Sequence, residues 1–290
     1  MLKTILSPNH IGADFSVEVM NEIIDLDRYP IHELKSKSGK VLLETCHNSL
    51  DSSAASSLHG FLRPDAIERA QLAMTELLPK SYRFPNVPRK TFPFPDPNSA
   101  NSLLANEVRG MKHDNSNNQI LNYQIPNNSE LRAIFLWPPF VDFIRQVRRV
   151  ETLFPSQCPH LALTSKIAFE GDTDGWHYDP NDGVVTLLLQ QSETGGEFEY
   201  APNIRSDSDE NYSGLKRLFD NPEKEARRVV QYAGTLVFFN GRNSMHRVRP
   251  VGPTVKPRIV VIFSYDLRSS QLFGESYVRM IHGLQQGVAT

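Results

Sequence analysis

The hydrophobic positions of the chain follow two different spacings. Before about residue 150 they recur at helical intervals, and this pattern predicts helices over 15–26, 65–78 and 137–149, the last of which starts at its prolines. After about residue 160 they gather into short β-branched and aromatic runs, which are typical of buried strands. The expected fold class is therefore mainly β with supporting helices.

Four strands are expected in the second half of the chain. They cover 184–189, 194–200, 234–240 and 257–265, and the Gly-Gly turn before the second of them is typical of a hairpin. In the first half, a further strand is expected around 120–124.

Residues 85–102 are rich in proline and asparagine, so they are predicted to form a long loop. This loop either crosses the surface or approaches the mouth of a functional site, and the sequence favours neither alternative.

Candidate metal ligands lie in Trp176-His177-Tyr178-Asp179-Pro180 and, far downstream, at His246. Side chains two apart on an extended strand point to the same side, so His177 and Asp179 converge, and Pro180 keeps Asp179 out of helical backbone angles. Two imidazoles and a carboxylate on one face of an octahedron are typical of non-haem iron(II) oxygenases, because the opposite face stays open for substrate and oxygen. The sequence therefore predicts an iron(II) site at His177, Asp179 and His246.

A His-x-Asp tripeptide alone says little in a chain with nine histidines, but here it has a context. From about 161 to 266 the residues resemble the iron(II)/2-oxoglutarate-dependent oxygenases, in which His-x-Asp, a strand, a Gly-Gly hairpin, a Gly-x-Leu-x-Phe strand, the distal His and a basic residue follow in this order. The resemblance implies a double-stranded β-helix (jelly-roll, cupin-like) core. It also implies Fe(II) as cofactor and 2-oxoglutarate and O2 as cosubstrates, with release of succinate and CO2.

The resemblance further implies a cation for the far carboxylate of 2-oxoglutarate. Arg258 heads an apolar strand, and its planar guanidinium suits a carboxylate. Lys256 is the alternative, because prolyl-hydroxylase-like members use a lysine near this point. We favour Arg258, since Lys256 precedes Pro257 and is expected in the loop.

Within the family, 186–190 and 195–200 look most like the branch of free-amino-acid radical halogenases and their hydroxylating relatives, and 26–30 and 58–64 fit it too. Halogenases of this kind replace the carboxylate ligand with a small residue so that chloride can bind iron, whereas this chain keeps Asp179. The resemblance therefore implies hydroxylation of an unactivated C–H of a free amino acid or similar small polar metabolite. The alternatives are a prolyl-hydroxylase-like enzyme acting on a protein, a halogenase, and a non-catalytic jelly-roll binding module.

Four residues around the ligands are candidates for substrate binding, namely Asp174, Trp176, Tyr178 and Asp182. Acidic or aromatic groups here could hold an ammonium group by ion pairing or a cation–π contact. Trp176 and Tyr178 alternate with the ligands, so they also fit a position on the opposite face, packed into core. No catalytic residue beyond the metal ligands is predicted.

Composition narrows the range of partners. A net charge of −2 and a pI near 6.5 give no basic field, so nucleic acid is not expected as a partner. Cys46 and Cys158 are too few for a disulfide framework and lack zinc-ligand spacing. No segment approaches the ~20 apolar residues of a membrane span, and the first residues lack the apolar stretch of a signal peptide. We expect a small-molecule enzyme of the cytoplasm, and the oligomeric state stays open.

The chain is expected to form a single oxygenase domain over 1–290. Residues 1–150 would supply helical support and loops, 151–268 the jelly-roll core, and 269–290 a C-terminal segment. Within the core, 203–228 is a polar, charge-dense insertion. Long insertions in compact domains are often lids, whereas charge runs are usually solvated helices and turns, and both interpretations stay open here.

Overall fold

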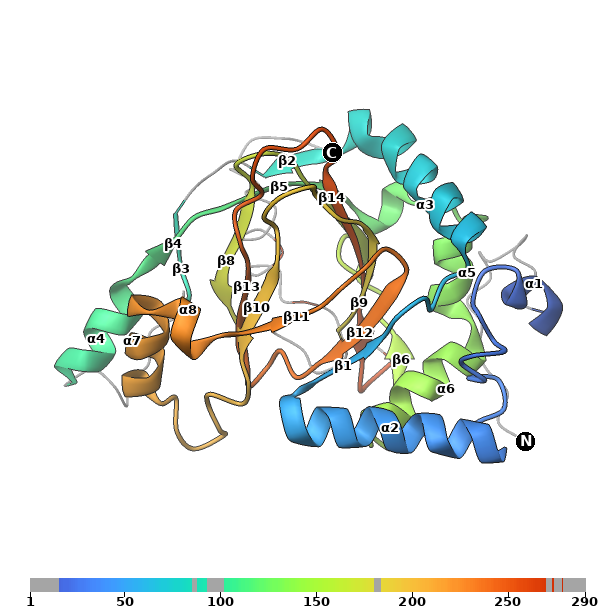
Figure 1. Cartoon of the computed structure of the whole chain (residues 1–290), viewed down its shortest axis with the longest axis horizontal. Helices are drawn as coiled ribbons and strands as arrows, with labels where there is room; N and C mark the ends of the chain where they lie inside the picture. Colours follow the sequence, from blue (N-terminus) through green and yellow to red (C-terminus); the bar gives the residue numbers. More distant parts are fainter. Residues whose placement is uncertain are drawn as a thin grey trace.

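A computed structural model describes residues 16–84, 88–92, 102–179 and 184–269, together with Phe273 and Val278. Its strands form a flattened barrel of two facing layers, with helices packed on the outer side of each layer (Figure 1). This is the expected β architecture with helical support.

The main sheet has eleven strands and bends so that its two halves face each other. The larger layer has the order β1-β12-β9-β14-β7-β5, with β2 paired to β5, and the smaller layer has the order β8-β13-β10-β11. Strand β5 pairs with both β7 and β8, so it joins the two layers. The strand bounds are β1 (Ala55–Leu58), β2 (Tyr82–Phe84), β5 (Asn115–Ile120), β7 (Leu163–Ala168), β8 (Thr173–His177), β9 (Val185–Gln190), β10 (Phe198–Ala201), β11 (Arg227–Val229), β12 (Thr235–Phe239), β13 (Met245–Val248) and β14 (Arg258–Phe263).

Two small ribbons lie outside this sheet. They pair β3 (Arg89–Lys90) with β4 (Lys112–His113), and β6 (Phe154–Pro155) with β15 (Tyr265–Asp266). The helices are α1 (Val17–Asn21), α2 (Lys37–Ser53), α3 (Pro64–Leu77), α4 (Leu103–Gly110), α5 (Glu130–Leu136), α6 (Pro138–Val147), α7 (Tyr212–Asp220) and α8 (Pro222–Glu225), with short 3-10 turns at Leu78–Lys80 and Asn122–Gln124.

The large hydrophobic core lies between the larger layer and helices α2, α3, α5 and α6. Helix α6 starts at its prolines and buries Phe140, Ile144 and Val147, as its sequence pattern predicts. Helix α3 also confirms the expected helix over 65–78. The expected helix over 15–26 ends at Asn21, because the apolar residues after it turn away and Ile24 forms a β-bridge with Leu62.

Two expectations about strands are wrong. The strand expected at 120–124 lies at Asn115–Ile120 instead, and it is largely polar because its side chains line a polar cavity. The Gly-Gly segment does not form a hairpin, since β9 lies in the larger layer and β10 in the smaller. Gly195 and Gly196 have φ of 68° and 72°, a conformation that favours glycine, and they turn the chain from one layer to the other.

The insertion 203–228 covers the outer face of the smaller layer. Leu215 and Leu218 of α7 pack with Trp176 of β8 and Met245 of β13 in a small second core. Helix α4 lies against α7 on the same side (Figure 1). None of the described residues that line the large cavity comes from the insertion, so the lid interpretation finds no support in this arrangement.

Among the helices that the structure describes, none combines the length and apolar character that a bilayer crossing requires.

Candidate metal centre

The three predicted ligands lie together at the open end of the smaller layer. His177 ends β8, and it pairs in register with His246, the second residue of β13. Asp179 follows β8 by two residues, and its backbone N–H donates to the carbonyl of Gly241 at 3.1 Å. One ligand atom from each of the three side chains lies within 4.8 Å of the others. The backbone therefore brings two imidazoles and one carboxylate to one point.

Backbone carbonyls orient both imidazoles. Nδ1 of His177 lies 2.7 Å from the oxygen of Gly175, and Nδ1 of His246 lies 2.9 Å from the oxygen of Ser244. A carbonyl only accepts, so each Nδ1 carries the proton and each Nε2 is left with its lone pair. Nε2 of His246 lies 3.4 Å from Oδ1 of Asp179, on the side where a metal would bind. Such outer hydrogen bonds to ligand histidines are typical of metal sites.

The electrostatics favour the protonation states that a metal requires. Burial, and then the neighbouring His246, lower the pKa of His177, which keeps the imidazole neutral. Burial would raise the pKa of Asp179, but His246 and His177 lower it more, so the carboxylate stays charged. Metal ligands must be deprotonated to bind, and the shifts of His177 and Asp179 both favour this condition.

Gly241 provides the space for the carboxylate of Asp179. A Cβ at this position would lie 1.8 Å from Oδ2 and 2.6 Å from Cγ of Asp179. Any side chain here would push the carboxylate away from the two imidazoles. The sequence alone does not reveal this role of Gly241, since nothing in a local pattern shows which side chain packs against a glycine.

We expect Gly241→Ala to weaken metal binding by about tenfold or more, in the range observed for disrupted outer-shell partners of metal ligands. Anaerobic titration of iron(II) into the metal-free protein measures the affinity. Gly110→Ala is the matched control, because a Cβ there meets nothing within 4 Å. An iron affinity of Gly241→Ala equal to that of Gly110→Ala would contradict this role.

A cavity of about 590 Å³ lies between the two layers and includes all three ligands in its lining. Arg258 opens β14 and lines this cavity while only 5% exposed. Burial lowers the pKa of Arg258 to about 10, which still leaves the guanidinium charged at neutral pH. Its long hydrogen bond to Oε1 of Gln231, at 3.4 Å, does not neutralise it. The alternative cation, Lys256, is exposed and is not among the residues that line the cavity.

The four candidate substrate residues have different surroundings. Asp174 is buried in the cavity wall, where Lys166 and Asn115 bind its two oxygens. The ring of Trp176 lies in the second core, with the guanidinium of Arg247 4.6 Å from its centroid.

Tyr178 contributes to the cavity lining but packs against the second core, with the guanidinium of Arg205 3.7 Å from its ring centroid. Its hydroxyl is buried without a hydrogen-bond partner among the described residues. Asp182 lies outside the described residues.

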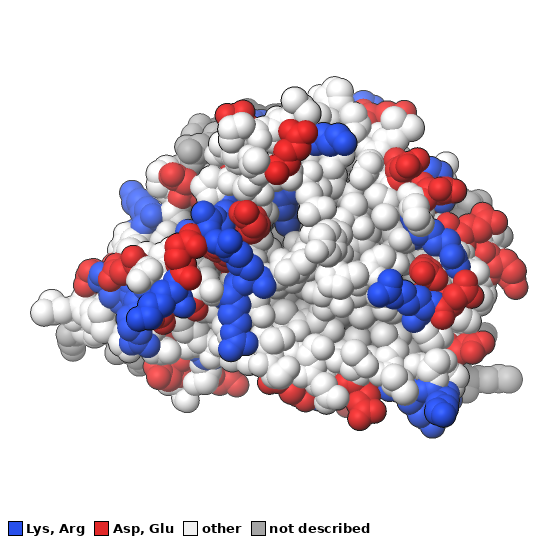
Figure 2. All heavy atoms as spheres, in the orientation of Figure 1, with Lys and Arg blue, Asp and Glu red and all other residues white. Residues whose placement is uncertain are grey.

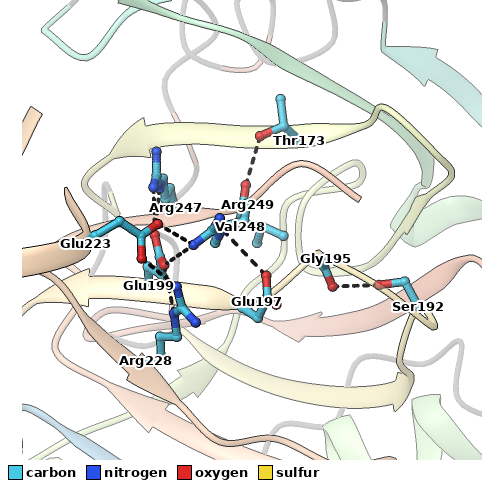
Figure 3. A network of polar contacts seen from close by, with 10 residues as sticks. All are labelled: Thr173, Ser192, Gly195, Glu197, Glu199, Glu223, Arg228, Arg247, Val248 and Arg249. Atoms are coloured by element: carbon cyan, nitrogen blue, oxygen red, sulfur yellow. Dashed lines mark hydrogen bonds and ion pairs between the residues drawn. The ribbon is translucent and has the colours of Figure 1, made fainter. Parts of the chain in front are cut away.

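A buried carboxylate ties the insertion to the strand that carries His246 (Figure 3). Glu199 of β10 is 1% exposed and accepts hydrogen bonds from Arg228 at 3.0 Å, Arg247 at 2.7 Å and Arg249 at 3.2 Å. Glu223 of α8 binds two of the same arginines, Arg228 at 2.9 Å and Arg249 at 2.6 Å. Glu199 is the buried member of this network, and loss of its arginine partners would leave its charge uncompensated, so these contacts tie α8 and β11 to β10 and β13.

Acidic and basic side chains are interleaved over α7, α8 and β11 on the face shown in Figure 2. Much of the remaining area of this face is uncharged. This face therefore has no extended basic surface of the kind that nucleic acid requires.

Comparison with known proteins gives the family and the fold. Residues 106–274 match the profile of the family described as Halogenase D (HalD). No sequence among the curated proteins matches the chain.

Solved structures of similar fold include AviO1 from Streptomyces viridochromogenes Tue57, with a TM-score of 0.51 and 13% identity over 80% of this chain and 95% of that one. The non-heme alpha ketoglutarate dependent carbocyclase SnoK, from nogalamycin biosynthesis, has a TM-score of 0.51 and 13% identity over 79% of this chain and 87% of that one. The epimerase SnoN from the same biosynthesis has a TM-score of 0.50 and 13% identity over 78% of this chain and 83% of that one.

The matched profile spans more than half of the chain and includes β5, β7 to β14 and all three candidate ligands. The chain therefore belongs to the Halogenase D family, and it has the jelly-roll fold of the iron(II)/2-oxoglutarate-dependent oxygenases.

Proposed function

We propose that this protein is an iron(II)/2-oxoglutarate-dependent dioxygenase that hydroxylates a C–H of a free amino acid or a similar small polar metabolite. The observation that carries this proposal is the joint lining of one cavity by the His177–Asp179–His246 cluster and Arg258. Among the described residues, no carboxylate pairs with the buried guanidinium of Arg258, and an anionic ligand would stabilise it because an unpaired buried charge is costly. A non-catalytic binding module would need neither group.

Each group has a distinct task in this proposal. His177, Asp179 and His246 would hold the iron, and Arg258 would bind the far carboxylate of 2-oxoglutarate through two parallel hydrogen bonds. When bound, iron and its two cosubstrates, 2-oxoglutarate and O2, supply the oxidative chemistry that releases succinate and CO2 and attacks the substrate. The side chains of the protein position the reactants and shield the site from water.

Hydroxylation is favoured over halogenation by Asp179. Its carboxylate faces the two imidazoles, and Gly241 leaves the space that this position requires. A third protein ligand occupies the site that a halide would need. The family name therefore describes relatives of this chain, and we assign the chain itself to hydroxylation.

The size of the cavity and the fold relatives support a small-molecule substrate. A volume of about 590 Å³ lies within the range of small-molecule sites. SnoK and SnoN, which share the fold, come from the biosynthesis of nogalamycin.

Among the described residues that line the cavity, the carboxylates are Asp174 and Asp179, and both have partners. Arg89 and Lys90 line it from β3, so we expect the substrate to carry a carboxylate or another anionic group.

We expect Asp179→Gly to lose most hydroxylation and to gain little chlorination. The substitution vacates one ligand position, but a stable halide site also needs donors shaped to it, and deleting a ligand does not create them. Product mass with and without saturating chloride measures both activities. Efficient chlorination by the variant would show that the surrounding side chains already bind an anion.

The experiment that tests the proposed function is a screen for substrate-stimulated succinate formation. The protein is supplied with iron(II), 2-oxoglutarate and oxygen, and amino acids and related metabolites are added one at a time. We expect one chemical class to stimulate succinate formation strongly and to gain one oxygen atom. Stimulation by proline-containing peptides alone would favour the prolyl-hydroxylase-like alternative instead.

A further inference from the structure

Lys166 is a second, partly buried cation that faces the cavity. It lies on β7, where it pairs in register with Val260 of β14 and Gln119 of β5. Arg258 lies two residues before Val260 and therefore projects from the same inner face of the larger layer. The side chain of Lys166 crosses the interior, and its ammonium contacts Asp174 of β8 in the opposite layer.

Asp174 fixes this ammonium close to the metal centre. Nδ2 of Asn115 donates to Oδ1 of Asp174 at 2.8 Å, and Lys166 binds Oδ2, so both carboxylate oxygens are engaged. Burial would raise the pKa of Asp174, but Lys166 and then His177 lower it well below its usual range, so the pair stays ionised. Asp174 comes three residues before His177 on the same strand.

The ammonium retains hydrogen-bonding capacity toward the cavity. A lysine ammonium has three N–H donors, and Asp174 is its one acceptor among the described residues. The side chain is 25% exposed, and Lys166 belongs to the cavity lining. Its remaining donors can therefore reach a ligand in the cavity.

The charged side chains of the cavity lining fit a dianionic ligand. The side chains of Arg258 and Lys166 balance those of Asp174 and Asp179, so a bound divalent metal ion would leave an excess of at least two positive charges, to which Arg89 and Lys90 of the same lining add. 2-Oxoglutarate carries two negative charges, one at each end. Both cations come from the larger layer and line the same cavity as the three candidate metal ligands.

We propose that Lys166 is the second cation of the cosubstrate site: its ammonium, held in place by Asp174 and Asn115, binds the keto-acid carboxylate of 2-oxoglutarate while Arg258 binds the far carboxylate. This inference rests on the proposed function. It also removes Asp174 from the candidates for binding a substrate ammonium, because its charge is already used to position Lys166.

The test measures ligand binding by calorimetry on the anaerobic, iron(II)-loaded protein. The probes are 2-oxoglutarate and 2-oxopentanoate, which has the same keto-acid end but a methyl group in place of the far carboxylate. The main variant is Lys166→Met/Asp174→Asn, which removes both charges of the pair and keeps an acceptor for Asn115. Lys166→Arg is the conservative variant, and Arg258→Met is the comparison for the far carboxylate.

We expect the double variant to bind both probes about tenfold or more weakly, and by a similar factor, as the loss of a charge-assisted hydrogen bond predicts. Arg258→Met should weaken the binding of 2-oxoglutarate far more than the binding of 2-oxopentanoate. Lys166→Arg should retain most of the native affinity for both probes. Iron stoichiometry and the thermal unfolding midpoint report whether the variants fold. If the double variant is unstable, Lys166→Gln, which keeps a donor toward Asp174, supplies the same comparison.

Native affinity of the folded Lys166 variants for both probes would overturn the inference and leave the pair as a structural ion pair. Unchanged affinity with a raised KM for the substrate would also overturn it, since Lys166 would then bind a carboxylate of the substrate. If the native protein itself binds no 2-oxoglutarate, the proposed function fails before any variant is compared. The two failures are therefore distinguishable.

Discussion

His177→Ala and His246→Ala are each expected to reduce iron(II) affinity by at least about a hundredfold while leaving the fold largely intact. The affinity should fall because each substitution removes one of three ligands, and metal affinity depends steeply on the number of ligands. The fold should persist because each imidazole makes one hydrogen bond to a backbone carbonyl and lines the cavity, and the rings that pack against His246 also line it. Iron per chain after anaerobic loading measures the first effect, and thermal unfolding measures the second.

His47→Ala is the matched control, because His47 contacts the backbone oxygen of Gln146 at 3.0 Å and does not line the cavity. It should bind iron as the native protein does. Full iron stoichiometry in both His177→Ala and His246→Ala would rule out the assigned centre.

Arg258→Ala is expected to raise the concentration of 2-oxoglutarate required for half-maximal turnover by on the order of a hundredfold, since truncating a buried charged partner costs several kcal/mol of binding. Lys256→Ala should leave this concentration nearly unchanged, because Lys256 is exposed. The two residues lie on the same segment, so the pair of variants controls for local disturbance. Initial rates of succinate formation at varied 2-oxoglutarate concentrations measure this quantity for both variants. A larger increase in Lys256→Ala than in Arg258→Ala would assign the binding of the far carboxylate to Lys256.

The elements that the sequence predicted best are those whose burial follows a simple period. Strands β9, β12 and β14 are mostly buried, so each contains a run of apolar residues. Helix α6 is apolar along one face only, and its prolines mark its start. The convergence of the candidate ligands His177 and Asp179 could be predicted for a related reason, because their spacing is a local property of an extended chain.

Strand β5 was misplaced because its buried residues are polar. Asn117 and Gln119 are 2% and 4% exposed, yet they face the cavity rather than a hydrophobic core. A hydrophobic pattern cannot identify such a strand. The polar run therefore indicates the functional cavity only once the fold is known.

Contacts between distant segments explain the remaining differences. The insertion is a charge-dense segment, but its Arg228 binds the buried Glu199 of another element, and Glu223 binds Arg228 and Arg249. Gly241 acts on Asp179 across a loop, and Lys166 reaches Asp174 across the interior. Each of these relations depends on the pairing of strands, which the chain order alone does not determine.

The measurement that tests the central claim most directly is the mass of the product formed by the native protein under saturating chloride. The assay contains iron(II), 2-oxoglutarate, oxygen and the stimulating substrate, and in the proposed site the carboxylate of Asp179 would occupy the position that a halide would need. We predict a product that carries one added oxygen atom and no chlorine, formed together with succinate. A chlorinated product would contradict the assignment of this chain to hydroxylation.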